Sequence, residues 1–233
     1  MEAEATRRAR QLLDTVSRSS GSEKYILGVS GIPGSGKTTF VNQLVRIINE
    51  EHKKDDSTQD IAIAVSMDGY HLPKAALDKF ENPQEAHARR GAHFTFDPNG
   101  ILQLLQAIRD PANHNAVIKA PSFDHAKGDP VADDIEIYPH HKIIIMEGIY
   151  LQLASPEPWN QIPAYFDEMW FIEVDTEQAR LRTGQRHFQA GLEPSLQAGI
   201  QRFDRNDLLN VQFILANRNT SSQCIKSVQE QDD

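Results

Sequence analysis

The sequence has little cysteine and no long apolar run. Cys224 is the only cysteine among 233 residues, so no internal disulfide can form, and no Cys/His cluster has the spacing of a zinc finger. No segment approaches the ~18 apolar residues of a membrane span, and residues 1–8 lack an apolar core of signal-peptide length. These absences predict a soluble cytoplasmic protein without a membrane partner, with a nuclear share left open.

Basic residues are also in deficit. The chain has 33 acidic and 24 basic residues, a net charge of −9, which opposes a general affinity for nucleic-acid phosphates. We therefore expect no nucleic-acid partner. A nucleotide can still bind where local cations meet its charge. The oligomeric state is left open, a homo-oligomer included.

One motif organises the rest of the chain. Residues 31–38 match a glycine, four residues and Gly-Lys-Thr, between the apolar run 25–29 and an amphipathic segment. The glycines let the backbone turn its N–H groups toward phosphate oxygens, and Lys37 should neutralise the β- and γ-phosphates. The Thr38 hydroxyl should ligate Mg²⁺. The predicted nucleotide-binding residues are Gly31, Ile32, Pro33, Gly34, Ser35, Gly36, Lys37, Thr38 and Thr39. The alternative, a turn that binds nothing, does not explain the complete pattern in its strand-turn-helix setting.

Apolar runs alternate with helical patterns along the chain. Strands are expected at 24–30, 61–65, 116–120, 142–148 and 169–174, and helices at 4–18, 36–50, 97–110 and 194–217. Such alternation predicts βαβ crossovers and a parallel sheet, whose ligands lie beyond the carboxyl ends of the strands. A small hairpin or edge strand at 133–138 and a final short strand at 224–228 are further candidates. The strand ends at 31–38, Asp68, 123–124 and Glu147 should therefore meet in one crevice.

The expected domain organisation is simple. Residues 1–23 form an N-terminal helix and linker, with 19–22 as the linker, and 24–228 form one domain with a mobile lid at about 176–192. Residues 51–59 are expected to form an exposed loop, and 229–233 a frayed tail.

Two strand-end acids are candidate catalytic residues. A kinase needs a carboxylate that accepts the proton of the attacking hydroxyl, and Asp68 is placed for that role, with Gly69 allowing a ligand to come close. Glu147 ends an apolar strand, where a carboxylate can hold Mg²⁺ directly or through water. The alternatives are an Asx turn at Asp68 and a capped turn at Glu147.

Arginines and aromatic residues supply the remaining candidates. Arg182 and Arg186 are one helical turn apart and could grip the transferring phosphate as a lid loosened by Gly184 and Gly191 closes; a solvated charged helix is the alternative. Segments 89–97 and 123–125 could line an acceptor pocket or serve as core and turns. The predicted substrate-binding residues are Asp68, Tyr70, His71, Arg90, Phe96, Phe123 and Asp124.

Together these motifs resemble the P-loop kinase family that groups uridine kinase, phosphoribulokinase and bacterial pantothenate kinase. The resemblance rests on residues 31–38, 67–71, 89–97, 121–124, 146–150 and the segment from Arg180, and is strongest to uridine-kinase-like proteins. It implies a three-layer α/β sandwich with a mostly parallel, about five-stranded sheet and a small arginine-bearing lid. It also implies ATP and Mg²⁺ as cofactors, Asp68 as base, Glu147 at the metal or substrate, and Arg182 or Arg186 in the lid.

The expected activity is transfer of the γ-phosphoryl group of ATP to a hydroxyl of a small metabolite, with a nucleoside such as uridine as first candidate. The alternatives are pantothenate, a sugar, or an ATPase or ATP-binding protein without an acceptor. A GTPase-type switch is disfavoured because the sequence has no Asn-Lys-x-Asp motif for reading guanine.

Overall fold

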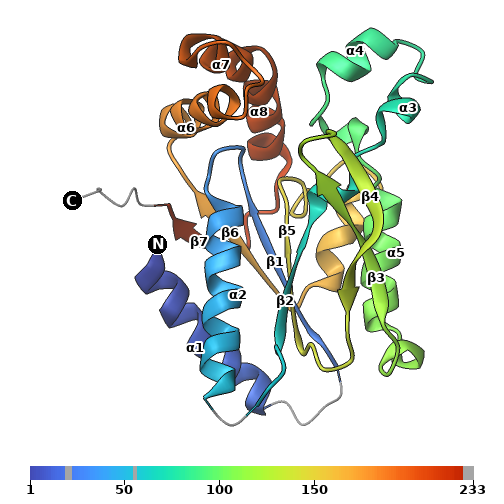
Figure 1. The fold of residues 1–233 in the computed structure, drawn as a ribbon, viewed down its shortest axis with the longest axis vertical. Helices are drawn as coiled ribbons and strands as arrows, with labels where there is room; N and C mark the ends of the chain where they lie inside the picture. Colours follow the sequence, from blue (N-terminus) through green and yellow to red (C-terminus); the bar gives the residue numbers. More distant parts are fainter. Residues whose placement is uncertain (19–22, 55–56, 228–233) are drawn as a thin grey trace.

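The central element is a parallel sheet. The computed structural model describes residues 1–18, 23–54 and 57–227, so the linker 19–22 and the tail 229–233 lie outside the described residues. The strands are β1 (Tyr25–Gly31), β2 (Ala62–Ser66), β5 (Ile143–Glu147), β6 (Glu168–Glu173) and β7 (Gln223–Lys226). They pair in parallel in the order β2-β5-β1-β6-β7 (Figure 1). The expected five-stranded α/β sandwich is confirmed.

Helices cover both faces of this sheet. On one face, Leu27, Val29 and Ile145 pack in one apolar cluster with α1 (Glu2–Arg18) and α2 (Lys37–Lys53). On the other, Ile26, Ile144 and Met146 pack with α5 (Pro98–Arg109), the 3-10 segment η4 (Trp159–Tyr165) and α8 (Leu208–Asn217). Successive strand residues alternate between the two faces, so the continuous apolar runs are buried on both sides. Within the described residues, no helix is long and apolar enough to cross the hydrocarbon core of a membrane.

Two helical lobes rise beyond the carboxyl ends of the strands. One contains α3 (Lys74–Leu77) and α4 (Pro83–Ala88), and the other contains α6 (Thr176–Gln189) and α7 (Leu196–Arg202) (Figure 1). The remaining short segments are η1 (Met67–Tyr70), η2 (His93–Thr95), η3 (Pro111–Asn113) and the π-helical turn η5 (Phe203–Asp207). The lobes flank the end of the sheet where the glycine motif lies.

The predicted strand at 116–120 is real, but it does not join the parallel sheet. β3 (Ile118–Asp124) pairs in an antiparallel hairpin with β4 (Asp129–Ile137). Ile118 and Ala120 are buried, Lys119 between them is exposed and the last four residues are partly buried, as suits a ribbon covered mainly on one face. Residues 123–124 therefore lie in the hairpin and do not follow a strand of the main sheet. The fifth parallel strand is the C-terminal β7.

Two helix boundaries also differ from the sequence-based expectations. α2 continues to Lys53, so the exposed segment after it is shorter than 51–59. The predicted helix 194–217 is interrupted by the π-helical turn η5, which separates α7 from α8. The N-cap of α5 is as expected, since the Asp97 carboxylate accepts a hydrogen bond from the Gly100 N–H.

A buried amide joins α2 to the edge strand β2. The Asn49 side chain donates to the Ala62 carbonyl at 3.0 Å and accepts from the Ala62 N–H at 2.9 Å. Ala62 begins β2, and β2 pairs with β5 on one side only. Asn49 thus satisfies backbone groups that an edge strand would otherwise leave unpaired.

We expect Asn49→Ala to lower the free energy of unfolding by about 1–3 kcal/mol, because both Ala62 groups would lose their partner while buried. Asn42→Ala, on an exposed position of the same helix, is the matched control and should change it by less than about 0.5 kcal/mol. Urea denaturation of the two variants and the unsubstituted protein measures the difference. Equal stability of both variants would contradict a clamping role for Asn49.

Candidate active site

The glycine motif forms a tight loop between β1 and α2. Gly34 and Gly36 have φ of 80° and 84°, and the Ser35 N–H donates to the Ile32 carbonyl at 3.1 Å. A Cβ atom at Gly34 would lie 2.4 Å from the Ala179 carbonyl oxygen of α6. Gly34 therefore meets two requirements, a left-handed backbone conformation and close contact with another backbone.

The N-terminus of α2 has no side-chain cap and could bind an anion. Gly36 caps it without a side-chain hydrogen bond, and its first turn has no acidic residue. The first N–H groups of a helix and its dipole favour a negative charge at this position. Lys37 makes no hydrogen bond or ion pair with any described residue, so its ammonium group is available to phosphate. The Ser35 hydroxyl is buried beside the loop, also without a partner among the described residues.

Glu147 lies at the end of β5, directly beside this helix start. Its side chain is 4% exposed, and its Oε1 accepts hydrogen bonds from the hydroxyls of Thr38 (3.2 Å) and Ser66 (2.8 Å). Its Oε2 is buried with no hydrogen-bond partner in the described part of the chain. A buried carboxylate oxygen without a partner is costly, so this atom calls for a cation or a donor.

These atoms fit a magnesium ion that is shared with phosphates. Mg²⁺ prefers hard oxygen ligands and is commonly held by one or two protein groups plus waters and phosphate oxygens. The Thr38 hydroxyl and the unpartnered oxygen of Glu147 are such groups. Among residues 1–18, 23–54 and 57–227, no cluster of three or more His, Cys, Asp or Glu side chains could hold a metal without other ligands.

Asp68 follows β2 in the η1 turn. The Ser66 hydroxyl caps this turn by accepting from the Asp68 N–H at 3.2 Å, while it donates to Glu147. The Ser66 hydroxyl thus connects the Glu147 carboxylate to the backbone N–H of Asp68, the other acid predicted to be catalytic. Sequence reasoning missed Ser66; a serine two residues before the aspartate is the signal that could have found it.

Gly69 has a different role from the one expected. A Cβ atom there would lie 2.2 Å from the Pro121 carbonyl oxygen, so β3 occupies the space that was assigned to a ligand. The glycine allows the hairpin to pack against the Asp68 turn. This contact brings segment 121–123 to the candidate base.

Aromatic rings lie next to Asp68. The His71 ring packs against Phe96 at a centroid distance of 3.9 Å and against Phe123 at 4.8 Å. Phe96 is placed by backbone pairing, since the Asp97 N–H donates to the Tyr70 carbonyl and residues 71 and 96 form a β-bridge. Tyr70 itself is buried, and that burial raises the pKa of its phenol. The structure therefore brings Tyr70, His71, Phe96 and Phe123 together.

The protonation of His71 follows from its surroundings. Burial is the main cause that lowers the pKa of His71, which keeps the imidazole neutral at pH 7. Its Nδ1 lies 2.9 Å from the Asp68 carbonyl oxygen, which can only accept, so Nδ1 bears the proton. Nε2 is then a hydrogen-bond acceptor.

Arg90 and Asp124 have partners within the protein. The Arg90 guanidinium lies 5.8 Å from the Phe123 ring centroid and donates to Asp129 at 2.9 Å and to the Leu72 carbonyl at 3.1 Å. Asp124 accepts from the N–H groups of residues 126 and 127 in the hairpin turn. Arg90 thus belongs to the aromatic cluster, while the carboxylate of Asp124 has the turn role that the sequence left open as an alternative.

Helix α6 packs on the phosphate loop. Ala179 and Thr183 lie against Gly34, and the Thr183 hydroxyl is buried without a partner among the described residues. Arg182 donates to the Ser227 hydroxyl at 2.9 Å, whereas Arg186 is exposed. Arg180 points elsewhere, paired with Asp204 at 2.6 and 2.7 Å.

Gly184 does not loosen this helix. A Cβ atom at Gly184 would lie 2.6 Å from Ile200, and one at Gly199 would lie 2.3 Å from the Gly184 carbonyl oxygen. The two glycines let α6 and α7 pack in backbone contact. Gly191 has a φ of 69°, and no atom lies within 4 Å of the position that a Cβ would take there. It comes just after the C-terminus of α6, where it supports a left-handed turn.

A cavity of about 470 Å³ opens beside the loop. Its walls come from the loop, the end of β6, the start of α6 and the end of β7, including Ile32, Phe171, Gln178 and Ser227. Arg218 also lines it, with its guanidinium 4.0 Å from the Phe171 ring centroid. Its position next to the phosphate loop suits the base of a nucleotide.

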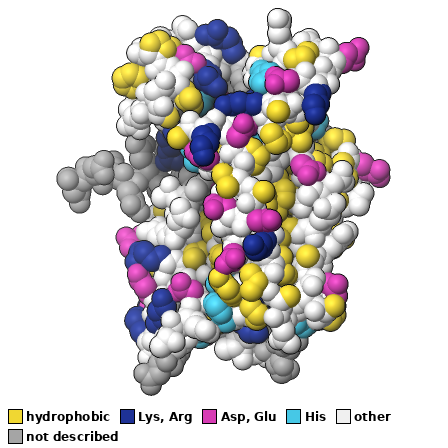
Figure 2. Space-filling view, turned by 45° about the vertical axis from the view of Figure 1, so that its right-hand side comes forward, with side chains coloured by type: hydrophobic (Ala, Val, Ile, Leu, Met, Phe, Trp, Pro, Cys, Tyr) yellow, Lys and Arg dark blue, Asp and Glu magenta, His cyan; other side chains and the backbone are white. Residues whose placement is uncertain are grey.

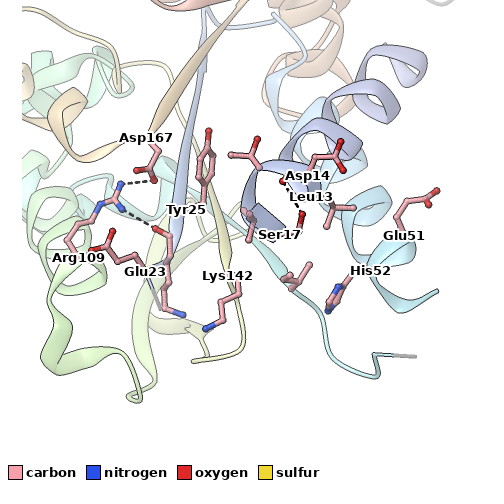
Figure 3. Close-up of a pocket in the computed structure, with 14 residues that line it drawn as sticks. Leu13, Asp14, Ser17, Glu23, Tyr25, Glu51, His52, Arg109, Lys142 and Asp167 are labelled. Carbon is pink, nitrogen blue, oxygen red and sulfur yellow. Dashed lines mark hydrogen bonds and ion pairs between the residues drawn. The ribbon is translucent and has the colours of Figure 1, made fainter. Parts of the chain in front are cut away.

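A second cavity, of about 690 Å³, lies at the opposite ends of the strands (Figure 3). Its polar groups bind one another: Arg109 donates to Asp167 and to the Lys24 carbonyl, and the Lys24 ammonium donates to the carbonyls of residues 138 and 141. Its lining contains no residue of the glycine motif and neither candidate acid, so this cavity is not the candidate active site.

Basic side chains gather where the two lobes approach each other above the sheet (Figure 2). This local positive charge lies on a chain with a net charge of −9. The phosphate loop, the acid at the end of β5 and the parallel sheet together define a P-loop nucleotide-binding protein.

Comparisons with known proteins specify the family. The model of the phosphoribulokinase/uridine kinase family matches residues 26–176, and the chain belongs to this family. It is 37% identical over 195 residues to "Putative uridine kinase C227.14" of Schizosaccharomyces pombe, covering 84% of this chain and 80% of that protein. It is 46% identical over 153 residues to "ATP-dependent kinase-like protein notR'" of Aspergillus versicolor, covering 65% and 88%.

A solved structure agrees over the whole fold. The crystal structure of the "putative fructose transport system kinase" of Silicibacter sp. TM1040 superposes with a TM-score of 0.79 at 28% identity, covering 95% of this chain and 98% of that one. The chain is therefore a P-loop kinase of this family, and family membership supports a phosphotransferase that acts on a small molecule.

We expect Gly34→Ala to lower the free energy of unfolding by at least about 2 kcal/mol, because it combines a strained φ with displacement of α6. Gly191→Ala is the matched control: its φ is also positive but no atom opposes the new methyl group, so about 1 kcal/mol is expected. Urea denaturation compares the two variants. Equal losses would show that contact with α6 does not constrain the loop.

Proposed function

We propose that the chain is an ATP- and Mg²⁺-dependent kinase that transfers the γ-phosphoryl group to a hydroxyl of a small metabolite. The observation that carries the proposal is the Ser66 hydroxyl, which bridges the Asp68 turn to Glu147 beside Thr38. Phosphoryl transfer depends mainly on positioning and charge neutralisation. The proposal is supported by this network, because it joins the Glu147 carboxylate beside Thr38 to the backbone of the turn that carries Asp68.

The loop residues have distinct roles in this mechanism. The N–H groups of the phosphate loop would hold the phosphate oxygens. The Lys37 ammonium, which has no partner among the described residues, would neutralise the β- and γ-phosphates. Thr38 and Glu147 would hold Mg²⁺, and the ion would neutralise part of the negative charge on the phosphate oxygens. Arg182 is held by Ser227 next to the loop, and Arg186 extends from the same helix.

Asp68 would act as the general base. Its carboxylate makes no hydrogen bond or ion pair with another described residue, while its backbone is fixed by Ser66 and by His71. It can therefore accept the proton of an acceptor hydroxyl as that oxygen attacks the γ-phosphorus. The cavity lined by Ile32, Phe171 and Arg218 would receive the base of the donor nucleotide.

The acceptor pocket would be the aromatic cluster beside Asp68. The partly buried rings of His71 and Phe123 would contact a planar group, with the buried Phe96 ring packed behind His71. The Nε2 of neutral His71 would accept a hydrogen bond from a hydroxyl or N–H group. These features support a nucleoside such as uridine as the first acceptor. Pantothenate or a sugar is the second candidate, because the Silicibacter relative is named for fructose transport.

Lys37→Ala should abolish turnover, because it removes the positive charge that the phosphates need.

Asp68→Asn should leave ATP binding nearly intact and slow transfer at least ~100-fold, because an amide cannot accept the proton. Calorimetry measures ATP binding by each variant, and single-turnover kinetics measures the rate of phosphoryl transfer. Asp60→Asn, an exposed position at the other end of β2, is the control and should transfer normally. Normal transfer by Asp68→Asn would exclude Asp68 as base.

A panel of nucleosides, pantothenate and sugars should contain an acceptor that raises ADP release and is recovered with one added phosphate. Mass spectrometry of the products separates a kinase from an ATPase, since an ATPase releases phosphate without a phosphorylated acceptor. ADP release that no panel member increases, with no phosphorylated product, would favour the ATPase alternative.

A further inference from the structure

The edge strand β7 ends beside the phosphate loop. Ser227 directly follows β7 and extends its pairing with β6, because the Ser227 N–H donates to the Glu173 carbonyl at 2.7 Å. The Ser227 hydroxyl oxygen lies 3.9 Å from the position that a Cβ atom at Gly36 would take. Gly36 is the N-cap of α2. The Ser227 hydroxyl therefore lies at the helix end that could bind an anion.

Contacts along β7 fix the position of this serine. Ile225 is buried in the apolar cluster that contains Trp170 of β6. At the start of the strand, the Gln223 side chain accepts from Arg8 of α1 and donates to Glu168 at 2.6 Å. Ser227 is thus carried by a strand that is anchored at its start, in its middle and at its end.

Arg182 of α6 is bonded to this serine. Its guanidinium donates to the Ser227 hydroxyl oxygen at 2.9 Å, and Ser227 is its only side-chain partner among the described residues. Arg180, one turn away from the loop in its bonding, is instead neutralised by Asp204 at 2.6 Å. Serine is uncharged, so its hydrogen bond fixes the Arg182 guanidinium without compensating the charge. The remaining N–H groups of Arg182 can bind phosphate oxygens.

Ser227 also lines the cavity of about 470 Å³ beside the loop, together with Ile32 and Gln178. It therefore stands between the cavity assigned to the nucleotide base and the N-terminus of α2, where the phosphates would lie. A bond that only tied α6 to β7 would not need this position. The placement favours a role in nucleotide binding.

We infer that Ser227 is a positioning residue for the donor nucleotide, whose hydroxyl holds the Arg182 guanidinium beside Gly36 so that it meets the phosphates. The inference deepens the proposed function and rests on it. Phosphate binding then depends on a strand that lies far from the glycine motif in the sequence.

Calorimetric titration of the full chain with MgATP tests this role. Ser227→Thr and Ser227→Val have the same shape and differ in the hydroxyl. Ser227→Val should weaken MgATP binding at least about fivefold, because the arginine must then be ordered on binding, whereas Ser227→Thr should stay within about twofold of the unsubstituted protein. Ser227→Ala, which adds no methyl group, should reproduce the loss.

Ser221→Val is the matched control. Ser221 lies two residues before β7, and its hydroxyl donates to Asn219 at 2.6 Å, away from the phosphate loop. This variant should bind MgATP as the unsubstituted protein does. A loss as large as that of Ser227→Val overturns the inference, because any change in the segment would then suffice.

A double-mutant cycle shows whether Ser227 acts through Arg182. Arg182→Gln removes the charge and should weaken MgATP binding at least about tenfold. Adding Ser227→Val to Arg182→Gln should change the affinity by less than about twofold, since the hydroxyl has no arginine left to hold. A purely structural role of Ser227 predicts the same loss with and without Arg182, and that result overturns the inference.

The remaining outcomes separate the inference from the proposed function. Equal MgATP affinities of Ser227→Val and Ser227→Thr overturn the inference, as does normal binding by Arg182→Gln. In both cases the unsubstituted protein still binds MgATP, so the kinase proposal stands. Absence of MgATP binding by the unsubstituted protein overturns the proposed function and the inference with it.

Discussion

The site depends on the hydrogen bonds that Glu147 accepts. Its Oε1 joins the hydroxyls of Thr38 and Ser66, which belong to α2 and β2, while Glu147 itself ends β5. Three elements that are distant in sequence are thereby fixed at one carboxylate. The buried Oε2 has no partner among the described residues, and such a buried carboxylate oxygen calls for a donor or a cation.

Close contacts at three glycines hold neighbouring segments against this network. Gly34 lies against α6, Gly69 against β3, and Gly148 against Met67, where an added Cβ would come within 2.4 Å of another atom in each case. Side chains at these positions would push the α6 lobe, the hairpin and the β2 end away from the phosphate loop. The glycines therefore allow the α6 lobe, the hairpin and the end of β2 to pack closely around the phosphate loop and the Asp68 turn.

Local patterns predicted much of the fold. The loop between β1 and α2 carries its signal within a few adjacent residues, and the buried strands show as continuous apolar runs. The partner of β3 could not be predicted, because an apolar run does not identify the strand with which it pairs. Likewise, the role of Ser66 depends on the register that places it opposite Glu147, and the roles of Gly69 and Gly184 depend on neighbours far away in sequence. Gly69 and Gly184 could thus be located in the sequence but not explained, and Ser66 was missed, because their roles depend on tertiary contacts.

The phosphate-binding residues and the candidate acceptor residues lie in different parts of the fold, which explains why family membership does not identify the acceptor. The phosphate loop follows β1 and Glu147 ends β5, and both of these strands are paired on two sides within the parallel sheet, which permits little variation. His71, Arg90 and Phe123 sit instead on short turns and on a hairpin outside that sheet, and they are held mainly by side-chain stacking and by a few side-chain hydrogen bonds. Such segments tolerate sequence change at little cost to the core, so relatives can share the donor chemistry and differ in the metabolite they phosphorylate. On the proposed function, acceptor choice would therefore depend on residues of the lobes and the hairpin rather than on the sheet.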